Sequence, residues 1–314
     1  MTNWLDKILS KAKTAGAKLA DSFRKKTIEN ADLWSSCPEC KKMFLGKELK
    51  KNLYVCTQCD HHYKISSKDR FNIFFDNQEW ELIKTKKLAE DPNKFKTELK
   101  VYKDQLKSAK KSTGQDASLI SAHGKVNGLD IVASAFNFKF IGGTLSMQSG
   151  ENFYAACQYA VDNKVDGLVV FVCTGGATLP ENMFALSMLP KTVLAVQKLK
   201  ENKIPYVVVG QINLGGTAAS LGSLGDQILM EPGKASFHGF AGKRVIEQNL
   251  KEALPEDFQS PTHVITTGAI DAIVHRKDQR ERISNFVAIL KHKNINNNQN
   301  FSEETSSYQK AVNQ

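Results

Sequence analysis

The chain has 314 residues, which suits one domain of moderate size joined to a small accessory module. Its hydrophobic content of 41% is enough for a sizeable core, and no stretch approaches the run of about 18 apolar residues that a membrane-spanning helix needs. The N-terminus has no apolar segment of the signal-peptide kind, so we expect a cytoplasmic protein. The formal net charge of +10 favours anionic partners, such as nucleic acid, an acidic protein or a phosphate-bearing small molecule.

The two ends of the chain differ in composition from its middle. Residues 1–32 combine spaced apolar side chains, among them Trp4 and Ile8, with an excess of lysine. We expect a basic amphipathic leader that either lies on a partner or is a frayed segment. Residues 293–314 are polar and contain few apolar side chains, so we expect a disordered tail.

Four cysteines form the sharpest motif of the chain. They are spaced C-x2-C-x15-C-x2-C and comprise Cys37, Cys40, Cys56 and Cys59. Each pair predicts a tight turn with converging sulfurs, and the two turns together predict a tetrahedral thiolate cage for one structural Zn²⁺ within residues 33–64. Disulfides are disfavoured because cytoplasmic thiols stay reduced. Four thiolates complete the coordination of the metal, so we expect His61 and His62 at the surface, and the surrounding lysines leave nucleic-acid contact open.

Residues 65–118 are expected to form a helical connector. Asp91 and Pro92 suit a helix start, and the apolar side chains that follow recur at helical spacing. These side chains are Phe95, Leu99, Tyr102 and Leu106. We expect them to pack against a core rather than to line a cofactor site.

A larger domain is predicted over residues 119–292. It opens with two alternating segments around Asn127-Gly128, a pattern typical of a β-hairpin. Strands and helices then alternate, which predicts an α/β fold with a largely parallel sheet and covered faces. The expected strands are 168–172, 204–209, 227–230, 235–240 and 269–274, and the expected helices are 150–163, 185–200, one from 245, and 280–291.

Two glycine pairs follow the central strands of this domain. Gly175-Gly176 come after the first strand and Gly215-Gly216 after the second, each before residues suited to a helix start. Glycine lets a ligand atom approach the backbone, and a helix start leaves N–H groups unpaired. Two such turns side by side predict a preorganised site for a developing oxyanion. The alternative is two ordinary strand-to-helix turns, because a lone glycine pair is a weak signal.

The two remaining cysteines, Cys157 and Cys173, are expected to be small apolar fillers. Cys173 ends a strand beside a glycine pair, but no histidine stands at a spacing that identifies a catalytic partner. The sequence also has no Gly-x-Ser-x-Gly elbow and no phosphate-binding P-loop.

Several ordered motifs run from the Trp4-Leu5-Asp6-Lys7-Ile8 start to about residue 292. They comprise the four-cysteine ribbon, DPNKFK at 91–96, NGLDIVASAFNFKFIGGTLSMQSGE at 127–151, EPGKASFHGFAGKRVIEQ at 231–248, LPEDFQSP at 254–261 and GAIDAIVHR at 268–276. Their combination in this order is far more specific than any one of them. In this combination the chain resembles the beta subunit of the bacterial acetyl-CoA carboxylase carboxyltransferase.

The resemblance implies a crotonase-like spiral of ββα units preceded by the zinc ribbon. It further implies transfer of a carboxyl group from carboxybiotin, held on a biotin carboxyl carrier protein, to acetyl-CoA, which gives malonyl-CoA for fatty acid biosynthesis. The site would lie between this subunit and a homologous alpha subunit in an α2β2 assembly, with biotin carboxylase in the wider complex. Biotin that has lost its carboxyl group would serve as the base, so the chain itself would need none.

The resemblance also implies roles for particular residues of this chain. In the family's pattern the backbone donors to the enolate oxygen match Gly175, Gly176, Gly215 and Gly216. Coenzyme A is polyanionic, which suits the positive net charge of the chain. The residues assigned to binding it are Lys243, Arg244, Gly142 and Gly143. For the two basic residues the alternative is ordinary solvated charge at a helix start.

Five residues near the glycine pairs depart from the family's pattern. Thr178 stands in place of an arginine, Asn182 in place of a glycine, and Asn213-Leu214 in place of two threonines. His238 stands where an aliphatic or small residue is usual; we expect a packed histidine, with titration near the site as the alternative. These departures leave open carboxyl transfer or decarboxylation on a related acyl-CoA, and a catalytically degenerate structural or nucleic-acid-binding partner.

Overall fold

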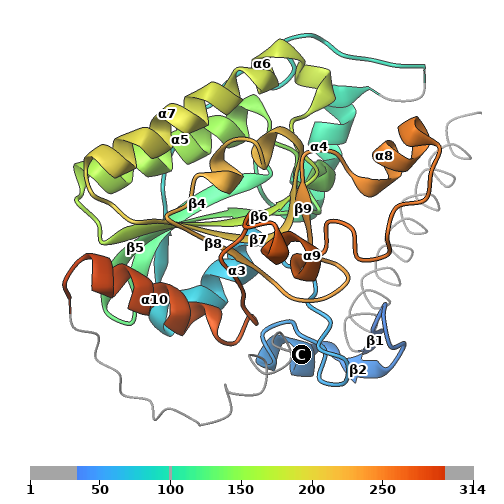
Figure 1. Ribbon diagram of the computed structural model, residues 1–314. Helices are drawn as coiled ribbons and strands as arrows, with labels where there is room; N and C mark the ends of the chain where they lie inside the picture. The colour runs from blue at the N-terminus through green and yellow to red at the C-terminus, as the bar shows by residue number, and fades with distance from the viewer. Residues whose placement is uncertain (1–33, 99–100, 294–314) are drawn as a thin grey trace, which may run out of the picture. The chain divides into compact units, whose positions relative to one another are not determined.

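The computed structural model describes residues 34–98 and 101–293 (Figure 1). The chain divides into two compact units, Met1–Tyr63 and Lys64–Gln314. The predicted leader, and all of the predicted tail except Lys293, lie outside the described residues. Within the two described stretches, no helix is both long enough and apolar enough to span a membrane.

The first unit is a small ribbon. β1 (Trp34–Ser36) pairs antiparallel with β2 (Met43–Leu45), and α2 (Gly46–Lys51) follows directly. A second turn is closed by an antiparallel bridge between Val55 and His62. His62 is buried, so its predicted surface position is wrong. His62 is paired directly with Val55, and paired residues of an antiparallel bridge point to the same face. Because Val55 is fully buried, His62 is buried with it.

The second unit is built on one eight-stranded sheet. Its order is β10-β8-β7-β6-β5-β4-β3, with β9 pairing farther along β7. The two pairings β3–β4 and β4–β5 are antiparallel, and all the others are parallel. The strands are β3 (Trp80–Leu82), β4 (Leu119–Val126), β5 (Leu129–Phe136), β6 (Gly167–Thr174), β7 (Tyr206–Leu214), β8 (Gln227–Met230), β9 (Phe237–Gly239) and β10 (Ala272–Ile273).

Helices cover both faces of this sheet. α5 and α7 lie on one face and α3 and α10 on the other (Figure 1). The helices are α3 (Ser67–Phe74), α4 (Tyr102–Thr113), α5 (Met147–Asp162), α6 (Met183–Leu186), α7 (Met188–Glu201), α8 (Lys243–Leu250), α9 (Pro261–Thr266) and α10 (Gln279–Leu290). Single 3₁₀ turns are η1 (Asp76–Gln78), η2 (Ile141–Gly143), η3 (Leu179–Glu181), η4 (Gly215–Thr217) and η5 (Leu221–Ser223).

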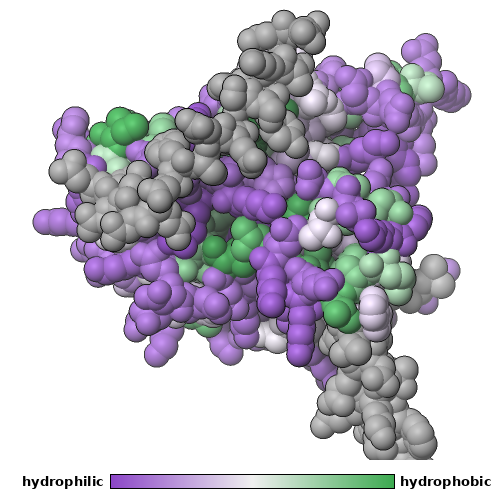
Figure 2. Space-filling view, turned by 90° about the horizontal axis from the view of Figure 1, so that it is seen from below, coloured by the Kyte–Doolittle hydropathy of each residue, from purple (hydrophilic) through white to green (hydrophobic). Residues whose placement is uncertain are grey.

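The central strand β6 shows why the sheet is covered on both faces. All eight of its residues are buried. Val170 packs into the core under α5 and α7, whereas Val169 and Phe171 pack into the core with α3 and α10, as the alternation of side chains along a strand requires. Outside these cores, hydrophilic side chains cover most of the face drawn in Figure 2.

The elements of the predicted α/β domain are confirmed. The β4–β5 hairpin turns at Asn127-Gly128 as expected, and the run of alternating strands and helices gives the parallel part of the sheet. The short turns differ, however. Each glycine pair leads into a single 3₁₀ turn, η3 or η4, rather than directly into a long helix.

The predicted helical connector was wrong in two respects. β3 forms a strand that joins the main sheet through β4. The helix expected near Asp91 begins only at Tyr102. The Asp91 carboxylate instead accepts a hydrogen bond from the N–H of Phe95 (3.0 Å) and closes a local turn. Phe95 is consequently not part of a helical stripe and is 38% exposed.

A buried ionic cluster ties both ends of the second unit to the sheet. Glu231, directly after β8, accepts hydrogen bonds from Arg70 of α3 (2.9 Å) and from Nε of Arg276 (2.9 Å), and Gln279 of α10 adds a third (3.1 Å). Glu231 is fully buried and both arginines are less than 8% exposed. Burial lowers the pKa of Arg70 to about 10, so its guanidinium remains charged at neutral pH. The single carboxylate therefore compensates two buried cations.

Removing this carboxylate is expected to destabilise the protein strongly. Glu231→Ala removes the carboxylate that pairs with both buried guanidinium groups, which should lower the free energy of unfolding by about 3–5 kcal/mol. The matched control is Asp116→Ala, which removes an acid that is 61% exposed and pairs with exposed Lys87; its effect should stay below about 1 kcal/mol. Urea unfolding followed by circular dichroism measures both, and equal effects would contradict this account.

Candidate functional site

The two glycine pairs lie at the same edge of the sheet. β6 and β7 are neighbours and run parallel, and their pairing ends at Thr174 opposite Asn213. A β-bulge interrupts the register just before, between Val172 and Cys173, and such bulges re-aim the residues that follow. The predicted arrangement of two glycine turns side by side is therefore present, at the strand ends where α/β sheets bind ligands.

The backbones of the two turns are in direct contact. A Cβ atom added to Gly176 would lie 3.3 Å from Cα of Gly215, and one added to Gly215 would lie 3.1 Å from Cα of Gly176. Both residues have positive φ, 107° and 69°, a conformation that side chains disfavour. A side chain at either position would therefore strain the backbone and push the two turns apart by a few tenths of an ångström.

A third glycine pair supports the first turn. The N–H of Gly175 donates to the carbonyl of Gly142 (3.1 Å). A Cβ on Gly143 would lie 2.1 Å from the carbonyl oxygen of Cys173, at the end of β6. Gly142 and Gly143, predicted to bind a ligand, therefore hold the Gly175-Gly176 turn against β6.

The predicted oxyanion donors differ in availability. The N–H of Gly175 is engaged by Gly142, and that of Gly176 donates to the hydroxyl of Thr174 (3.0 Å). The next N–H, that of Ala177, donates to no acceptor within residues 34–98 and 101–293. In the second turn, η4 begins at Gly215, and the N–H groups at the start of such a turn have no acceptor inside it. Sequence reasoning missed Ala177, which only its place after the pair would have indicated.

The first turn is anchored by a buried carboxyl group. Glu181, at the end of η3, is 3% exposed. It accepts hydrogen bonds from the hydroxyl of Tyr102 (2.7 Å) and from the N–H of Met147 at the start of α5 (2.6 Å). Burial raises the pKa of Glu181, although both hydrogen bonds oppose this. The turn is thereby fastened to α4 and α5.

Residues that depart from the family's pattern line the same turn. Thr178 is buried, and its N–H donates to the carbonyl of Leu145 (3.0 Å). Asn182 has φ 52° and ψ −126°, a conformation that glycine adopts freely and asparagine tolerates better than most residues. The large apolar side chains beside it are exposed: Leu179 by 86% and Met183 by 68%.

The predicted basic residues lie beyond the second turn. Lys243 and Arg244 form the start of α8, four residues after Gly239 of β9, which pairs with Leu214. The carbonyl oxygen of Phe240 would lie 3.8 Å from a Cβ on Gly215, so this segment passes close to the turn. The ammonium of Lys243 donates to the carbonyl of Pro255 (2.6 Å), and Arg244 is exposed.

His238 is a packed residue, as expected. It lies on β9, is 8% exposed, and contacts Asn213 through its Nδ1 atom (3.0 Å). Burial lowers its pKa. Cys157 and Cys173 are also buried in the core, and burial raises the pKa of Cys173 to about 12, so its thiol is protonated at neutral pH. These cysteines are fillers, as predicted.

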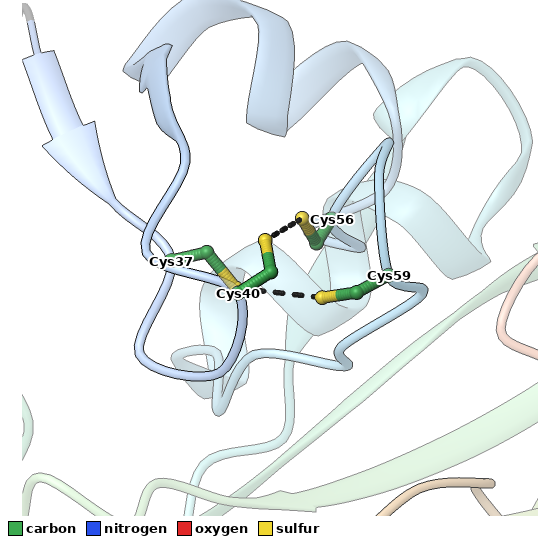
Figure 3. Close-up of side chains that lie close together, drawn as sticks. All are labelled: Cys37, Cys40, Cys56 and Cys59. Carbon is green, nitrogen blue, oxygen red and sulfur yellow. Dashed lines mark hydrogen bonds between the residues drawn. The ribbon is translucent and has the colours of Figure 1, made fainter.

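The four cysteines of the first unit converge as the spacing predicts (Figure 3). All four sulfurs lie within 4.8 Å of one another. Cys37 and Cys59 are 3.6 Å apart at Sγ, and Cys40 and Cys56 are 3.8 Å apart. Tetrahedral Zn²⁺ with Zn–S bonds of about 2.3 Å requires sulfurs about 3.8 Å apart, whereas a disulfide requires about 2 Å. The residues present fit one zinc ion.

The titration of these thiols also favours a cation. Burial alone would raise the pKa of Cys37, but hydrogen bonds from the Cys40 N–H and the Tyr63 hydroxyl outweigh it and lower the pKa to about 6. For Cys59, burial and the neighbouring sulfurs raise the pKa to about 12. Cys37 therefore loses its proton readily, whereas the neighbouring sulfurs oppose loss of the proton from Cys59. A divalent cation bound between the sulfurs would favour the thiolate form of both.

Comparison with known families agrees with both units. Residues 34–59 match the family described as acetyl-CoA carboxylase zinc finger domain, and residues 83–312 match the family described as carboxyl transferase domain. A Pseudomonas malonate decarboxylase hetero-dimer matches at a TM-score of 0.54 and 20% identity, covering 72% of this chain and 86% of that chain. A transcarboxylase 12S structure matches at 0.56 and 19%, covering 72% of this chain and 42% of that one. These two structures show the fold, the crotonase-like α/β fold expected from the sequence.

Two curated relatives are similar over most of the chain. The "acetyl-coenzyme A carboxylase carboxyl transferase subunit beta" of Pelagibacter ubique is 39% identical over 307 residues, covering 97% of each chain. The protein of the same name from Acinetobacter baumannii is 40% identical over 273 residues, covering 87% of this chain and 88% of its own. With its zinc ribbon, its paired glycine turns and these matches, the chain belongs to the family of acetyl-coenzyme A carboxylase carboxyl transferase beta subunits.

Proposed function

We propose that this chain transfers a carboxyl group from carboxybiotin to acetyl-CoA and so forms malonyl-CoA, together with an alpha subunit. Membership of the family supports the reaction class. The observation that carries the proposal is the direct contact of two glycine turns at the ends of β6 and β7. Such a pair of turns suits a reaction in which negative charge develops on one oxygen.

The oxygen in question belongs to the thioester. Loss of a proton from the methyl carbon of acetyl-CoA gives an enolate, whose negative oxygen needs donors in fixed positions. We assign this role to the N–H groups of Ala177 and of the Gly215-Gly216 turn, because those of Gly175 and Gly176 are engaged within the protein. The first glycine pair then acts by allowing the two turns to approach.

The proton acceptor is proposed to come from the substrate side. The carboxyl groups and histidines near the turns are engaged: Glu181 by Tyr102 and Met147, and His238 by Asn213. In the reaction the bond between the carboxyl carbon and N1 of biotin breaks, and that carbon bonds to the former methyl carbon of acetyl-CoA. The proton removed from the methyl group goes to N1 of biotin, so no base from this chain is required.

Coenzyme A is proposed to bind beside the second turn. Its phosphates are anionic, and Lys243 and Arg244 stand at the N-terminal end of α8, where the helix dipole also favours negative charge. Arg244 is exposed, and the ammonium group of Lys243 donates to the carbonyl of Pro255. We keep Gly142 and Gly143 in the proposed site as the support of the first turn.

The family implies an alpha subunit as partner. We propose the α2β2 form and a biotin carboxyl carrier protein as further partners, with biotin carboxylase in the wider complex. Leu179, Met183 and Phe184 support a protein contact near the first turn, because they are large, apolar and 47–86% exposed. A cytoplasmic location is proposed because thiolate ligands need a reducing compartment. Nucleic-acid binding by the first unit is supported only by the lysines of that unit.

Substitution of Gly176 tests the proposed site. Gly176→Ala places a Cβ against the backbone of Gly215 and should displace the neighbouring donor Ala177 from the second turn, so kcat should fall by about 100-fold, as when an oxyanion donor is lost. The measurement is malonyl-CoA-dependent carboxylation of free biotin by the purified chain with its alpha subunit. The control is Gly268→Ala, because Gly268 also has positive φ (76°) but open space around it.

Wild-type protein should turn over only when both subunits are present. An absence of turnover in a stable complex of the two subunits would contradict the proposed function. Equal losses in the two alanine variants would leave the reaction standing but refute the role of the contact between the turns.

Metal removal should affect the two units differently. The first unit has few buried apolar side chains, so zinc binding supplies much of its folding free energy. Chelation should therefore make residues 34–63 sensitive to protease, while residues 64–293 keep their own core and remain resistant. Peptide mapping by mass spectrometry measures this, with re-addition of Zn²⁺ as the control. Unchanged cleavage after complete zinc removal would contradict a folding role for the metal.

A further inference from the structure

A buried polar pair stands at the base of the second glycine turn. Asn213, two residues before Gly215, is fully buried, and His238 is 8% exposed. The two residues are register partners in the parallel pairing of β7 with β9. The amide nitrogen Nδ2 of Asn213 lies 3.0 Å from Nδ1 of His238. Burial of a polar group costs free energy unless the group is hydrogen-bonded, so this contact offsets part of the cost of burying both side chains.

The hydrogen-bond partners fix the protonation state of the histidine. Nδ2 of Asn213 also donates to the carbonyl of Gly222 (2.9 Å), so this nitrogen is the amide donor, and no donor reaches its Oδ1 atom among the described residues. An amide nitrogen carries two hydrogens and accepts none. Nδ1 of His238 must therefore be the acceptor, which means a neutral ring with its proton on Nε2.

The surroundings of His238 keep the ring neutral. Burial lowers its pKa below the usual value of 6.5, and among the described residues burial is the cause of this shift. The backbone N–H of His238 donates to the carbonyl of Gln259 (3.0 Å), which lies in the loop before α9. Two titratable residues flank that loop: Asp257 is exposed, and the ring of His263 packs against Phe258.

The pair joins the segments that shape the second turn. Through Asn213 it connects the end of β7 with η5, at Gly222, and with β9, at His238. β9 leads directly to Phe240, whose carbonyl oxygen approaches Gly215. The positions of Gly215 and Gly216 therefore depend on a bond that Asn213 makes only to a neutral imidazole.

We propose that Asn213 and His238 are positioning residues that hold the Gly215-Gly216 turn in its reactive geometry, and that protonation of His238 releases this turn. The proposal rests on the proposed function. A proton on Nδ1 would set two donors against each other, so the bond to Asn213 would be lost. The site is then active with the neutral ring and impaired with the charged one.

The sign of the pH dependence follows from the direction of the shift. In the unfolded chain His238 takes up its proton near pH 6.5, whereas in the folded chain it does so only at a lower pH. Well above pH 6.5 this residue is neutral in both states, and its contribution to stability is constant. As the pH falls below that value, the unfolded state binds more protons and stability decreases. The loss of activity should appear at the lower, folded-state pKa.

Two substitutions of His238 separate the hydrogen bond from the titration. Gln can accept through Oε1 and does not titrate, whereas Leu can do neither. With the alpha subunit present, His238→Gln should keep kcat near the wild-type value at neutral pH and lose the acid decline that His238 causes. At neutral pH His238→Leu should lower kcat about 5-fold with little change in KM, as loss of one hydrogen bond predicts, and it too should lose the acid decline that His238 causes. His292→Gln, an exposed histidine, is the control and should behave as wild type.

An unchanged acid decline in His238→Gln would overturn the proposal, as would full kcat in His238→Leu. Nuclear magnetic resonance of the imidazole nitrogens in the full chain gives a readout independent of turnover. A proton on Nε2 of His238 supports the pair, and a proton on Nδ1 at neutral pH overturns it. If the wild-type subunits show no turnover while Nε2 carries the proton, the proposed function has failed and the pairing itself has not.

Discussion

The contact between the backbones of Gly176 and Gly215 is the constraint on which the larger unit depends. A methyl group on either residue would come within 3.1–3.3 Å of the other residue's Cα, so the two turns meet this closely because neither residue has a side chain. The parallel pairing of β6 with β7 brings them to one edge, and the bulge before Cys173 adjusts the last residues. Burial of β6 on both faces makes that pairing rigid.

Each turn is held by one buried polar anchor. The first turn is fastened through the carboxyl group of Glu181, which two donors from α4 and α5 satisfy. The second is fastened through the amide of Asn213, which donates to η5 and to His238. These hydrogen bonds favour one arrangement, because an alternative would leave the carboxyl group of Glu181 and the Nδ2 atom of Asn213 buried and unpaired. Preorganisation of the proposed oxyanion site thus comes from residues outside the turns.

The parts predictable from sequence were those written in local patterns. The spacing of four cysteines predicted the thiolate cage, Asn127-Gly128 predicted the hairpin, and the β-branched run at 168–172 predicted the central strand. The meeting of the two glycine pairs was also predictable, because parallel neighbours end at the same edge.

The parts that sequence reasoning missed depend on distant residues. Tyr102 and Glu181 are 79 positions apart, and no local pattern pairs them. His62 was expected at the surface because four cysteines already complete the coordination of a zinc ion. Its burial comes instead from packing within the first unit, which the cysteine spacing does not predict. Phe95 was predicted to be the first member of a helical stripe, but the Asp91 carboxylate accepts a hydrogen bond from its N–H and closes a local turn there instead. In each case a tertiary contact overrode a local preference.

The most direct test of the central claim is a crystal structure of the complex of both subunits with a non-reactive acetyl-CoA analogue. The thioester oxygen is expected to lie about 2.7–3.1 Å from the backbone nitrogen of Ala177 and from a backbone nitrogen of the Gly215-Gly216 turn. An analogue bound in this subunit with its thioester oxygen away from both turns would contradict the account.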